Sequence, residues 1–238
     1  DPMAPKTLAT HIAEGLTSLA AQAGKNLTEI SGVGVGLAGI VDAGAGHVYW
    51  SPSLSQRDVD FARVLAEHVP GRVYLDNDAN LVATAEKANG IGRGLSDFIV
   101  LTIESGVGMG IVLGGQVYRG ARGSGAEFGH TKVQYDGALC RCGQRGCLEA
   151  YVADYALVRE ASIALELDRD HSEPMPQVLE RLYAQAQEGN EAARAIFRRA
   201  GRYLALGIAN VTNLFDPTKV ILSGERLRYD YLYNEEVL

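Results

Sequence analysis

Cysteine is scarce in this 238-residue chain, and its three copies lie close together, at positions 140, 142 and 147. An odd number of cysteines, two of them separated by one residue, argues against a disulfide framework. No apolar run approaches the roughly 18 residues that span a bilayer, and the first residues lack the basic-then-apolar pattern of an export signal. We therefore expect a cytoplasmic protein without a membrane segment, in a reducing compartment where free cysteines more often bind metals than form bridges.

An excess of basic charge is also missing. The chain has 22 Lys and Arg residues and 29 Asp and Glu residues, which gives a net charge of -7. Because phosphate contacts need clustered Lys and Arg, these residues do not themselves predict a nucleic-acid-binding surface. Internal repeats of solenoid period and low-complexity segments are absent as well. The length and ordinary globular composition fit one large domain or two modest ones.

The hydrophobic pattern predicts strands first, then helices, and then a final strand. This order favours an α/β protein of two joined lobes. Glycine, with 28 copies against seven prolines, is placed between apolar runs and indicates tight turns. In the first half of the chain we expect a helix over 5–23 that ends at Gly24, a strand over 32–42 followed by a hairpin turn and a short strand, and a helix over 58–69. A strand over 73–75 then leads through a polar run to a helix over 81–90, and a hairpin over 97–120 turns at Gly114-Gly115. The rest of the chain should form helices over 149–210, broken only by a loop at 168–176, and a strand over 216–225 that ends in a glycine turn.

The cysteine segment CRCGQRGC predicts a zinc site. His130, Cys140, Cys142 and Cys147 are four ligands of the types that zinc prefers, and Gly143 and Gly146 let the loop between them turn tightly. The alternative is three reduced core cysteines beside an unrelated histidine. The polar residues within the segment disfavour that alternative. Four protein ligands leave no open coordination position, so the expected metal is structural.

Two glutamates flank the candidate zinc ligands. Glu127 precedes His130 by three residues, and Glu149 follows Cys147 by two. A zinc ion that joins His130 to the cysteine loop would bring both carboxylates closer together, which suits the recognition of several hydroxyl groups of a polyol. The alternative is that both are solvated surface residues, the usual place of Glu. Spacing alone leaves the two interpretations open.

Two further segments are ambiguous by themselves. In LDNDAN, Asp76, Asn77 and Asp78 lie between a strand and a helix, where they are either ordinary helix caps or ligand-binding groups, and an aspartate there can serve as a general base. In ESGVGMG, the backbone amides of a glycine-rich turn can bind phosphate, but Glu104 would place a carboxylate beside a polyanion.

Together these segments resemble the ROK family, which contains sugar kinases and sugar-responsive transcriptional repressors. The resemblance runs in order through GLAGIVDAGAGHV, DNDAN, GVGMGIVLGGQVYRGARGSGAEFGH, CRCGQRGCLEAY and KVILSGE. It implies an actin-like ATPase (ribonuclease H-like) fold with two lobes. We expect residues 1–101 to form a partial N-terminal α/β lobe without its first hairpin, and residues 102–238 a C-terminal α/β lobe with the zinc loop.

The resemblance also implies roles for particular residues. Asp78 matches the general base of the kinases, and Asn77, Asp78, Glu127, His130 and Glu149 match residues that contact the sugar. His130 would contact the sugar through one ring nitrogen and the zinc through the other. The glycines that match the nucleotide-binding turns are Gly106, Gly108 and Gly224.

Departures from the kinase pattern favour the repressor branch. The Asp-x-Gly-x-Thr hairpin that grips phosphate in the kinases is not found in the sequence. The second phosphate turn, usually Gly-Thr-Gly, reads Glu104-Ser105-Gly106, and the adenosine-side turn reads Ser223-Gly224-Glu225. Both changes add negative charge where ATP would bind.

The sequence thus predicts the sugar-sensing domain of a ROK-type regulator, with a hexose or hexose derivative bound between two lobes beside a structural Zn²⁺. The resemblance implies DNA as a partner, through a helix-turn-helix domain outside this chain, and a homodimer or homotetramer. The alternative is a kinase for glucose, fructose, mannose or an N-acetylhexosamine, which would use ATP and Mg²⁺. A third possibility is a zinc-stabilised scaffold that binds neither sugar nor nucleotide.

Overall fold

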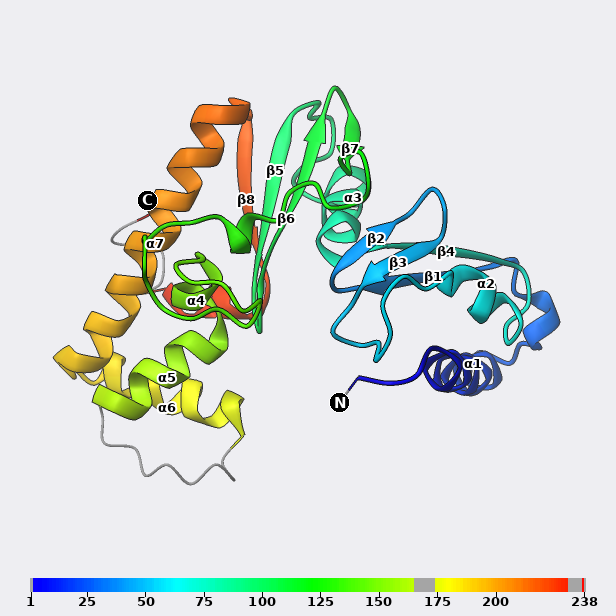
Figure 1. Cartoon of the computed structure of the whole chain (residues 1–238), viewed down its shortest axis with the longest axis horizontal. Coiled ribbons are helices and arrows are strands. Elements are labelled where there is room, and N and C mark those ends of the chain that lie inside the picture. The colour runs from blue at the N-terminus through cyan, green and yellow to red at the C-terminus, as the bar shows by residue number, and fades with distance from the viewer. Residues whose placement is uncertain (1, 165–173, 231–236, 238) are drawn as a thin grey trace. The chain divides into compact units, whose positions relative to one another are not determined.

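The computed structural model describes residues 2–164, 174–230 and 237 (Figure 1). Its internal contacts divide the chain into a first unit, Asp1–Arg93 with Gln116–Ala126, and a second unit, Gly94–Gly115 with Glu127–Leu238. The boundary expected after residue 101 falls within a strand of the second unit. Among the residues described, no helix combines the length and the apolar character required to cross a membrane.

The first unit combines a short parallel strand pair, an antiparallel hairpin and three helices. β1 pairs in parallel with β4, and β2 pairs with β3 across a tight turn. Helix α1 packs on α2, and both α2 and α3 contact β4. The elements are α1 (Pro5–Gln22), η1 (Leu27–Glu29), β1 (Gly32–Leu37), β2 (Ile40–Asp42), β3 (His47–Trp50), α2 (Phe61–Ala66), β4 (Arg72–Asn77), α3 (Asp78–Asn89) and β7 (Gln116–Tyr118).

The single strand expected over 32–42 is wrong, because the chain turns at Gly39 and forms β1 and β2 as separate strands. Gly39 has a φ of +113°, which a residue with a side chain rarely adopts. Helix α2 is shorter than expected, since it begins after Asp60, whose carboxylate caps it by accepting a hydrogen bond from Arg63 N. Helix α3 begins earlier than expected, at Asp78. The predicted helix over 5–23 is confirmed to within one residue by α1.

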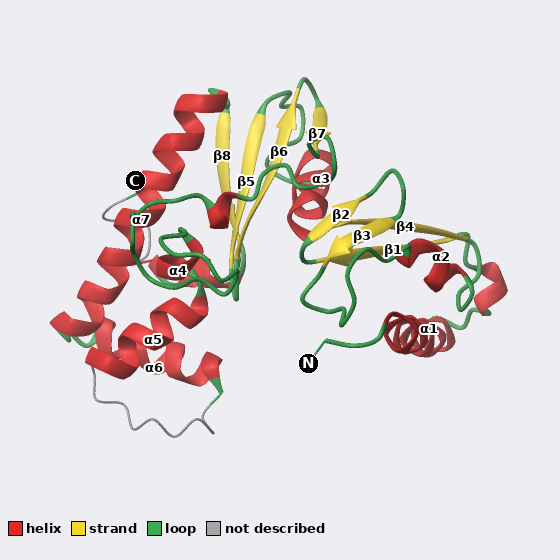
Figure 2. Cartoon of the chain, viewed as in Figure 1, coloured by secondary structure: helices red, strands yellow, loops and turns green. Residues whose placement is uncertain are grey.

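The second unit is built on a sheet in which β6, β5 and β8 are neighbours in that order. β5 pairs antiparallel with β6 and parallel with β8. Helices α5, α6 and α7 pack against one another, and α4 contacts α5 and α7 (Figure 2). The elements are β5 (Phe98–Ile103), β6 (Val107–Leu113), η2 (Phe128–His130), α4 (Glu149–Val152), α5 (Asp154–Ala164), α6 (Met175–Gln187), α7 (Glu191–Phe215), β8 (Lys219–Ser223) and η3 (Glu225–Arg228).

Two expectations for the second unit need correction. β5 and β6 are joined at residues 104–106, so the Gly114-Gly115 turn is a second turn and not the one that joins them. The helical stretch expected over 149–210 continues to Phe215 and is also interrupted at Ala153 and at 188–190. Residues 168–173 of the expected loop lie outside the described residues. The final predicted strand is confirmed by β8.

The core of the second unit holds the site-bearing segments in place. Phe98, Ile99, Val100 and Leu101 of β5 are fully buried. Phe128 and Leu148, which come shortly before His130 and Glu149, are also buried, at 1% and 0% exposure. Burial of these two large side chains fixes the backbone that carries the candidate site.

Candidate metal centre

Backbone hydrogen bonds shape the cysteine segment into a tight loop. Cys140 N donates to Gln144 O at 2.8 Å, and Gly143 N donates back to Cys140 O at 3.0 Å. At the end of the loop, Cys147 forms an antiparallel bridge with Lys132. Gly143 and Gly146 have φ values of +85° and +76°, so the two predicted glycine turns are confirmed. The loop therefore turns back on the segment that carries His130.

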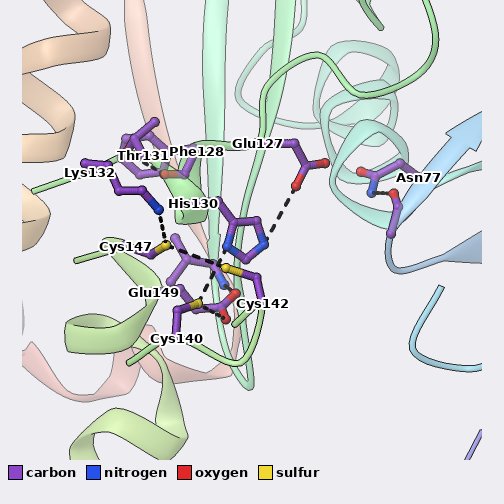
Figure 3. A network of polar contacts seen from close by, with 12 residues as sticks. Asn77, Glu127, Phe128, His130, Thr131, Lys132, Cys140, Cys142, Cys147 and Glu149 are labelled. Carbon is purple, nitrogen blue, oxygen red and sulfur yellow. Dashed lines mark hydrogen bonds and ion pairs between the residues drawn. The ribbon is translucent and has the colours of Figure 1, made fainter. Parts of the chain in front are cut away.

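The structure brings the four predicted metal ligands together. The ligand atoms of His130, Cys140, Cys142 and Cys147 all lie within 4.8 Å of one another (Figure 3). Cys142 Sγ is 3.7 Å from Cys147 Sγ, and Cys140 Sγ is 3.7 Å from His130 Nδ1. A tetrahedral zinc ion with Zn–S bonds of about 2.3 Å places its sulfur ligands about 3.8 Å apart. The donor set and the spacing therefore fit zinc.

Cys140 and Cys142 differ in acidity because their surroundings differ. Burial raises the pKa of Cys140 to about 12. Burial also opposes ionisation of Cys142, but hydrogen bonds from the backbone of Gln144 and from the other two cysteines hold its pKa below the usual value. Burial thus favours the protonated thiol of Cys140, and a bound metal cation would favour its thiolate.

His130 has its two ring nitrogens facing different groups. Nδ1 faces Cys140, whereas Nε2 lies 3.8 Å from Glu127 Oε2 (Figure 3). The side chain of His130 is 32% exposed and that of Glu127 is 42% exposed. A metal on Nδ1 would fix the tautomer with the proton on Nε2, which then can donate a hydrogen bond outward.

Glu149 is buried, with 9% of its surface exposed, so the surface interpretation of this residue is wrong. Its Oε1 accepts a hydrogen bond from Tyr155 O–H at 3.4 Å and lies 3.5 Å from Cys140 Sγ. Its Oε2 accepts from Val107 N at 3.4 Å. Glu149 thus contacts a candidate metal ligand directly.

The polar residues of LDNDAN belong to the first unit, so the structure describes them separately from Glu127, His130 and Glu149. Asn77 caps α3, since its Oδ1 accepts a hydrogen bond from Asn80 N at 3.2 Å. Its amide nitrogen donates to Gly39 O at 3.0 Å. Asp78 is exposed in the first turn of the helix, and its Oδ1 accepts from Ala79 N at 2.9 Å.

The glycines matched to nucleotide binding have different surroundings. Gly106 lies in the β5–β6 turn, where a Cβ atom would be 3.2 Å from Glu149 Oε2, whereas Gly108 lies within β6. Gly224 follows β8, and a Cβ atom there would be 2.7 Å from Ile103 O and 3.2 Å from Glu104 Oε1. Their assignment to a nucleotide stays a prediction.

Sequence reasoning missed two residues that contact the cysteines. Lys132 Nζ donates to Cys147 Sγ at 2.9 Å, and this hydrogen bond raises the pKa of the lysine. Tyr155 O–H donates to Cys140 Sγ at 3.6 Å, and the guanidinium of Arg141 lies 4.1 Å from the centre of its ring. Neither residue has a spacing or motif that would have indicated its position.

Both repressors and kinases resemble the chain. A glucokinase of Streptomyces coelicolor is 34% identical over 205 residues, which are 82% of this chain and 65% of the relative. A xylose repressor of Caldicellulosiruptor bescii is 30% identical over 213 residues, which are 87% of this chain and 53% of the relative. The chain thus spans between half and two thirds of the length of these relatives.

The fold agrees with that of a solved regulator. A crystal structure of a ROK family transcriptional regulator, a homologue of the Escherichia coli MLC protein, matches 99% of this chain and 60% of its own, with a TM-score of 0.83 and 25% identity. The predicted actin-like ATPase (ribonuclease H-like) α/β fold is thereby confirmed. The ROK family model matches residues 2–238, and the chain therefore belongs to the ROK family.

Proposed function

We propose that the chain is the sugar-sensing effector domain of a ROK-type transcriptional regulator, which binds a hexose or hexose derivative next to a structural zinc. The observation that best supports a regulator is the position of Glu104. Its side chain lies against Gly224, where a Cβ atom would be 3.1 Å from Glu104 Cγ and 3.2 Å from Glu104 Oε1. One carboxylate therefore lies at the junction of the two glycine turns that match nucleotide binding.

Negative charge at this junction disfavours ATP. Glu225 follows Gly224 directly, and its side chain is 78% exposed. The carboxylate of Glu104 beside a bound triphosphate would repel it unless a cation intervened, whereas the charge of Glu225 is partly offset by Arg226, whose Nη1 lies 3.5 Å from Glu225 Oε2. A protein that senses a sugar without phosphorylating it does not need to bind ATP. A carboxylate beside the nucleotide-binding turns is therefore compatible with a sensor but would be a disadvantage for a kinase.

The sugar side offers several partners for hydroxyl groups. Glu149 is held by Tyr155 and by the β6 backbone, and His130 presents Nε2 on the side away from the cysteines. Carboxylates accept hydrogen bonds from hydroxyls, and a metal-bound imidazole donates from its other nitrogen. Glu127 and, from the first unit, Asn77 and Asp78 complete the proposed set.

The proposed zinc has a structural role. Three thiolates and one imidazole fill a tetrahedral site and leave no position for a substrate. Zinc would therefore supply cross-linking of the loop to η2 and a fixed ring orientation for His130. It would take no direct part in a reaction.

The proposed DNA partner would be bound through a helix-turn-helix domain outside this chain. The xylose repressor relative is longer, since the match covers 53% of it. Sugar binding would alter the relative positions of DNA-binding domains in a homodimer or homotetramer.

The alternative is an ATP-dependent sugar kinase in which Asp78 is the general base. Its support is the exposed carboxylate of Asp78 at the first turn of α3, together with the glucokinase relative. An exposed carboxylate there can accept a proton from a sugar hydroxyl.

Calorimetry on the full-length protein tests the proposal. Titrations with glucose, fructose, mannose, xylose and N-acetylglucosamine should show binding of at least one sugar, whereas ATP with Mg²⁺ should show no micromolar binding. Micromolar ATP binding, or transfer of phosphate to any of these sugars, would establish the kinase instead.

Matched variants distinguish the sensor from a scaffold. Glu149→Gln and Glu127→Gln should reduce the sugar-induced thermal shift, because each removes a carboxylate acceptor. Glu188→Gln, at the exposed end of α6, is the control. If all three variants behave alike, the sugar assignment fails and the zinc-stabilised scaffold is the better description.

A further inference from the structure

The three candidate thiolate ligands differ in their exposure to solvent. Cys147 is 0% exposed and Cys140 is 3% exposed, whereas Cys142 is exposed. All three sulfurs nevertheless belong to one cluster, and Cys142 Sγ is 3.7 Å from Cys147 Sγ. A reagent in solution therefore has direct access to only one of the three sulfurs.

The two buried sulfurs also have side-chain hydrogen-bond donors. Lys132 Nζ donates to Cys147 Sγ at 2.9 Å, and Tyr155 O–H donates to Cys140 Sγ at 3.6 Å (Figure 3 shows the lysine). Among the described residues, the hydrogen-bond partners of Cys142 Sγ are the other two cysteines and the backbone of Gln144, while the charge of Lys132 also acts on it without a hydrogen bond. The exposed sulfur is thus also the one without a donor from outside the cluster's own loop.

The net charge of the proposed zinc centre makes the difference in hydrogen-bond donors among the three cysteines important for their reactivity. A divalent zinc with three thiolates and a neutral imidazole has a net charge of about -1. Lys132 can offset that charge, and its ammonium withdraws electron density from Cys147. Hydrogen bonds from outer groups stabilise a metal–ligand contact and reduce the nucleophilicity of the ligand. Cys142 keeps the greatest nucleophilicity of the three.

We propose that Cys142 is a modification site, the ligand at which soft electrophiles and hydrogen peroxide react with the metal centre. With peroxide, the Cys142 sulfur attacks one oxygen, the O–O bond breaks, and hydroxide leaves, which gives a sulfenic acid. Cys147 then attacks that sulfur, an S–S bond forms, and a second hydroxide leaves. The two sulfurs lose two electrons in total, and the peroxide, after taking up two protons, becomes two molecules of water.

Loss of two thiolates would weaken the whole site. His130 and Cys140 alone hold a divalent cation poorly, so metal is released and the loop loses its connection to η2. The inference rests on the metal centre within the proposed function and is independent of the sugar. Protein that is purified without chelator and contains no metal by elemental analysis overturns the zinc assignment and this inference with it. Zinc-loaded protein that fails the tests below overturns this inference alone, and neither result bears on sugar binding.

Alkylation of the zinc-loaded full-length protein tests the order of reaction. With iodoacetamide below one equivalent, the attacking sulfur displaces iodide and leaves a stable mass tag. Peptide mass spectrometry should find the first tag on Cys142, at a rate on the order of tenfold above that of Cys140 or Cys147. Equal rates, or a first tag on either buried cysteine, would overturn the proposal.

Lys132→Met tests the protection of Cys147, with Lys219→Met on β8 as the control in the same unit. Removal of an outer partner typically weakens a metal site about tenfold or more, so zinc transfer to a chromophoric chelator should accelerate by about that factor in Lys132→Met alone. Peroxide should produce a peptide linked through Cys142 and Cys147 as zinc is released. Equal zinc release by the two lysine variants, or release without that linkage, contradicts the inference.

Discussion

Arg119 and Asp76 form an ion pair that joins the loop after β7 to the end of β4. Both Nε and Nη2 of Arg119 donate to Asp76 Oδ2, at 3.0 and 2.7 Å. The other carboxylate oxygen accepts from Asn77 N and from Asn80 Nδ2. Asp76 is therefore a structural residue that holds the start of α3, the helix that carries Asp78.

Removal of the guanidinium leaves the buried carboxylate without its cation. We expect Arg119→Met to lower the free energy of unfolding by about 2 kcal/mol, below the value for a fully buried pair because the Arg119 side chain is 38% exposed. Urea unfolding measures the change. Arg122→Met, three residues later and exposed, should change it by less than about 0.5 kcal/mol. Equal effects would show that the pair does not hold the loop.

Gly143 and Gly146 provide a matched test of the metal loop. Both have positive φ values, but a Cβ atom at Gly146 would lie 1.8 Å from Gln134 O, whereas Gly143 has no atom within 4 Å. Gly143→Ala should cost about 1 kcal/mol from backbone strain and keep the metal. Gly146→Ala should displace the loop and abolish metal binding. Zinc content by elemental analysis distinguishes the two, and retained zinc in Gly146→Ala would contradict the loop geometry.

Ala126 adopts a conformation that suits glycine better. Its φ is +71°, and it directly precedes Glu127. Ala126→Gly should therefore raise the free energy of unfolding by about 1 kcal/mol. Ala121→Gly, in the same loop but without a positive φ, should lower it by about 0.4–1 kcal/mol through unfolded-state entropy. Thermal and urea unfolding of both variants give the sign of the change in the free energy of unfolding. A loss of stability in Ala126→Gly would show that the backbone at Ala126 is not strained.

Charge at Glu104 should control the affinity for triphosphate. Glu104→Gln removes one carboxylate beside Gly224, so binding of ATP with Mg²⁺ should strengthen by about tenfold, the effect of removing a repulsion of roughly 1.4 kcal/mol. Calorimetry or a fluorescent nucleotide measures the change, with Glu188→Gln as control. Unchanged affinity would mean that the carboxylate does not disfavour the nucleotide.

The cluster of His130 with the three cysteines could be predicted because the residues that form it are close together in the sequence. Three cysteines within eight positions and a histidine ten residues before them restrict both ligand type and loop length. Helix α1 and the β2–β3 hairpin were also predictable, since periodicity and turn residues lie within each segment. The family resemblance supplied the fold, which periodicity alone would not have given.

Contacts between distant residues could not be predicted in this way. Asp76 meets Arg119 across 43 positions, and nothing in LDNDAN distinguishes a buried, paired aspartate from an exposed one such as Asp78. The break at Gly39 was missed because apolar residues continue on both sides of it, and only the φ value reveals the turn. Lys132 and Tyr155 were missed because their partners are set by the folded loop.

The position of β5 between β6 and β8 determines when the second unit can complete its folding during synthesis. Its residues FIVLTI are apolar or β-branched and carry no charge. Phe98 of β5 pairs with Lys219 of β8, so one edge of β5 stays unpaired until β8, which is synthesised much later, leaves the ribosome. Until then the strand has the composition and the open edge of an aggregation-prone segment. The second unit can therefore finish folding only after β8 emerges, and we expect nascent chains that stall before that point to be prone to aggregation.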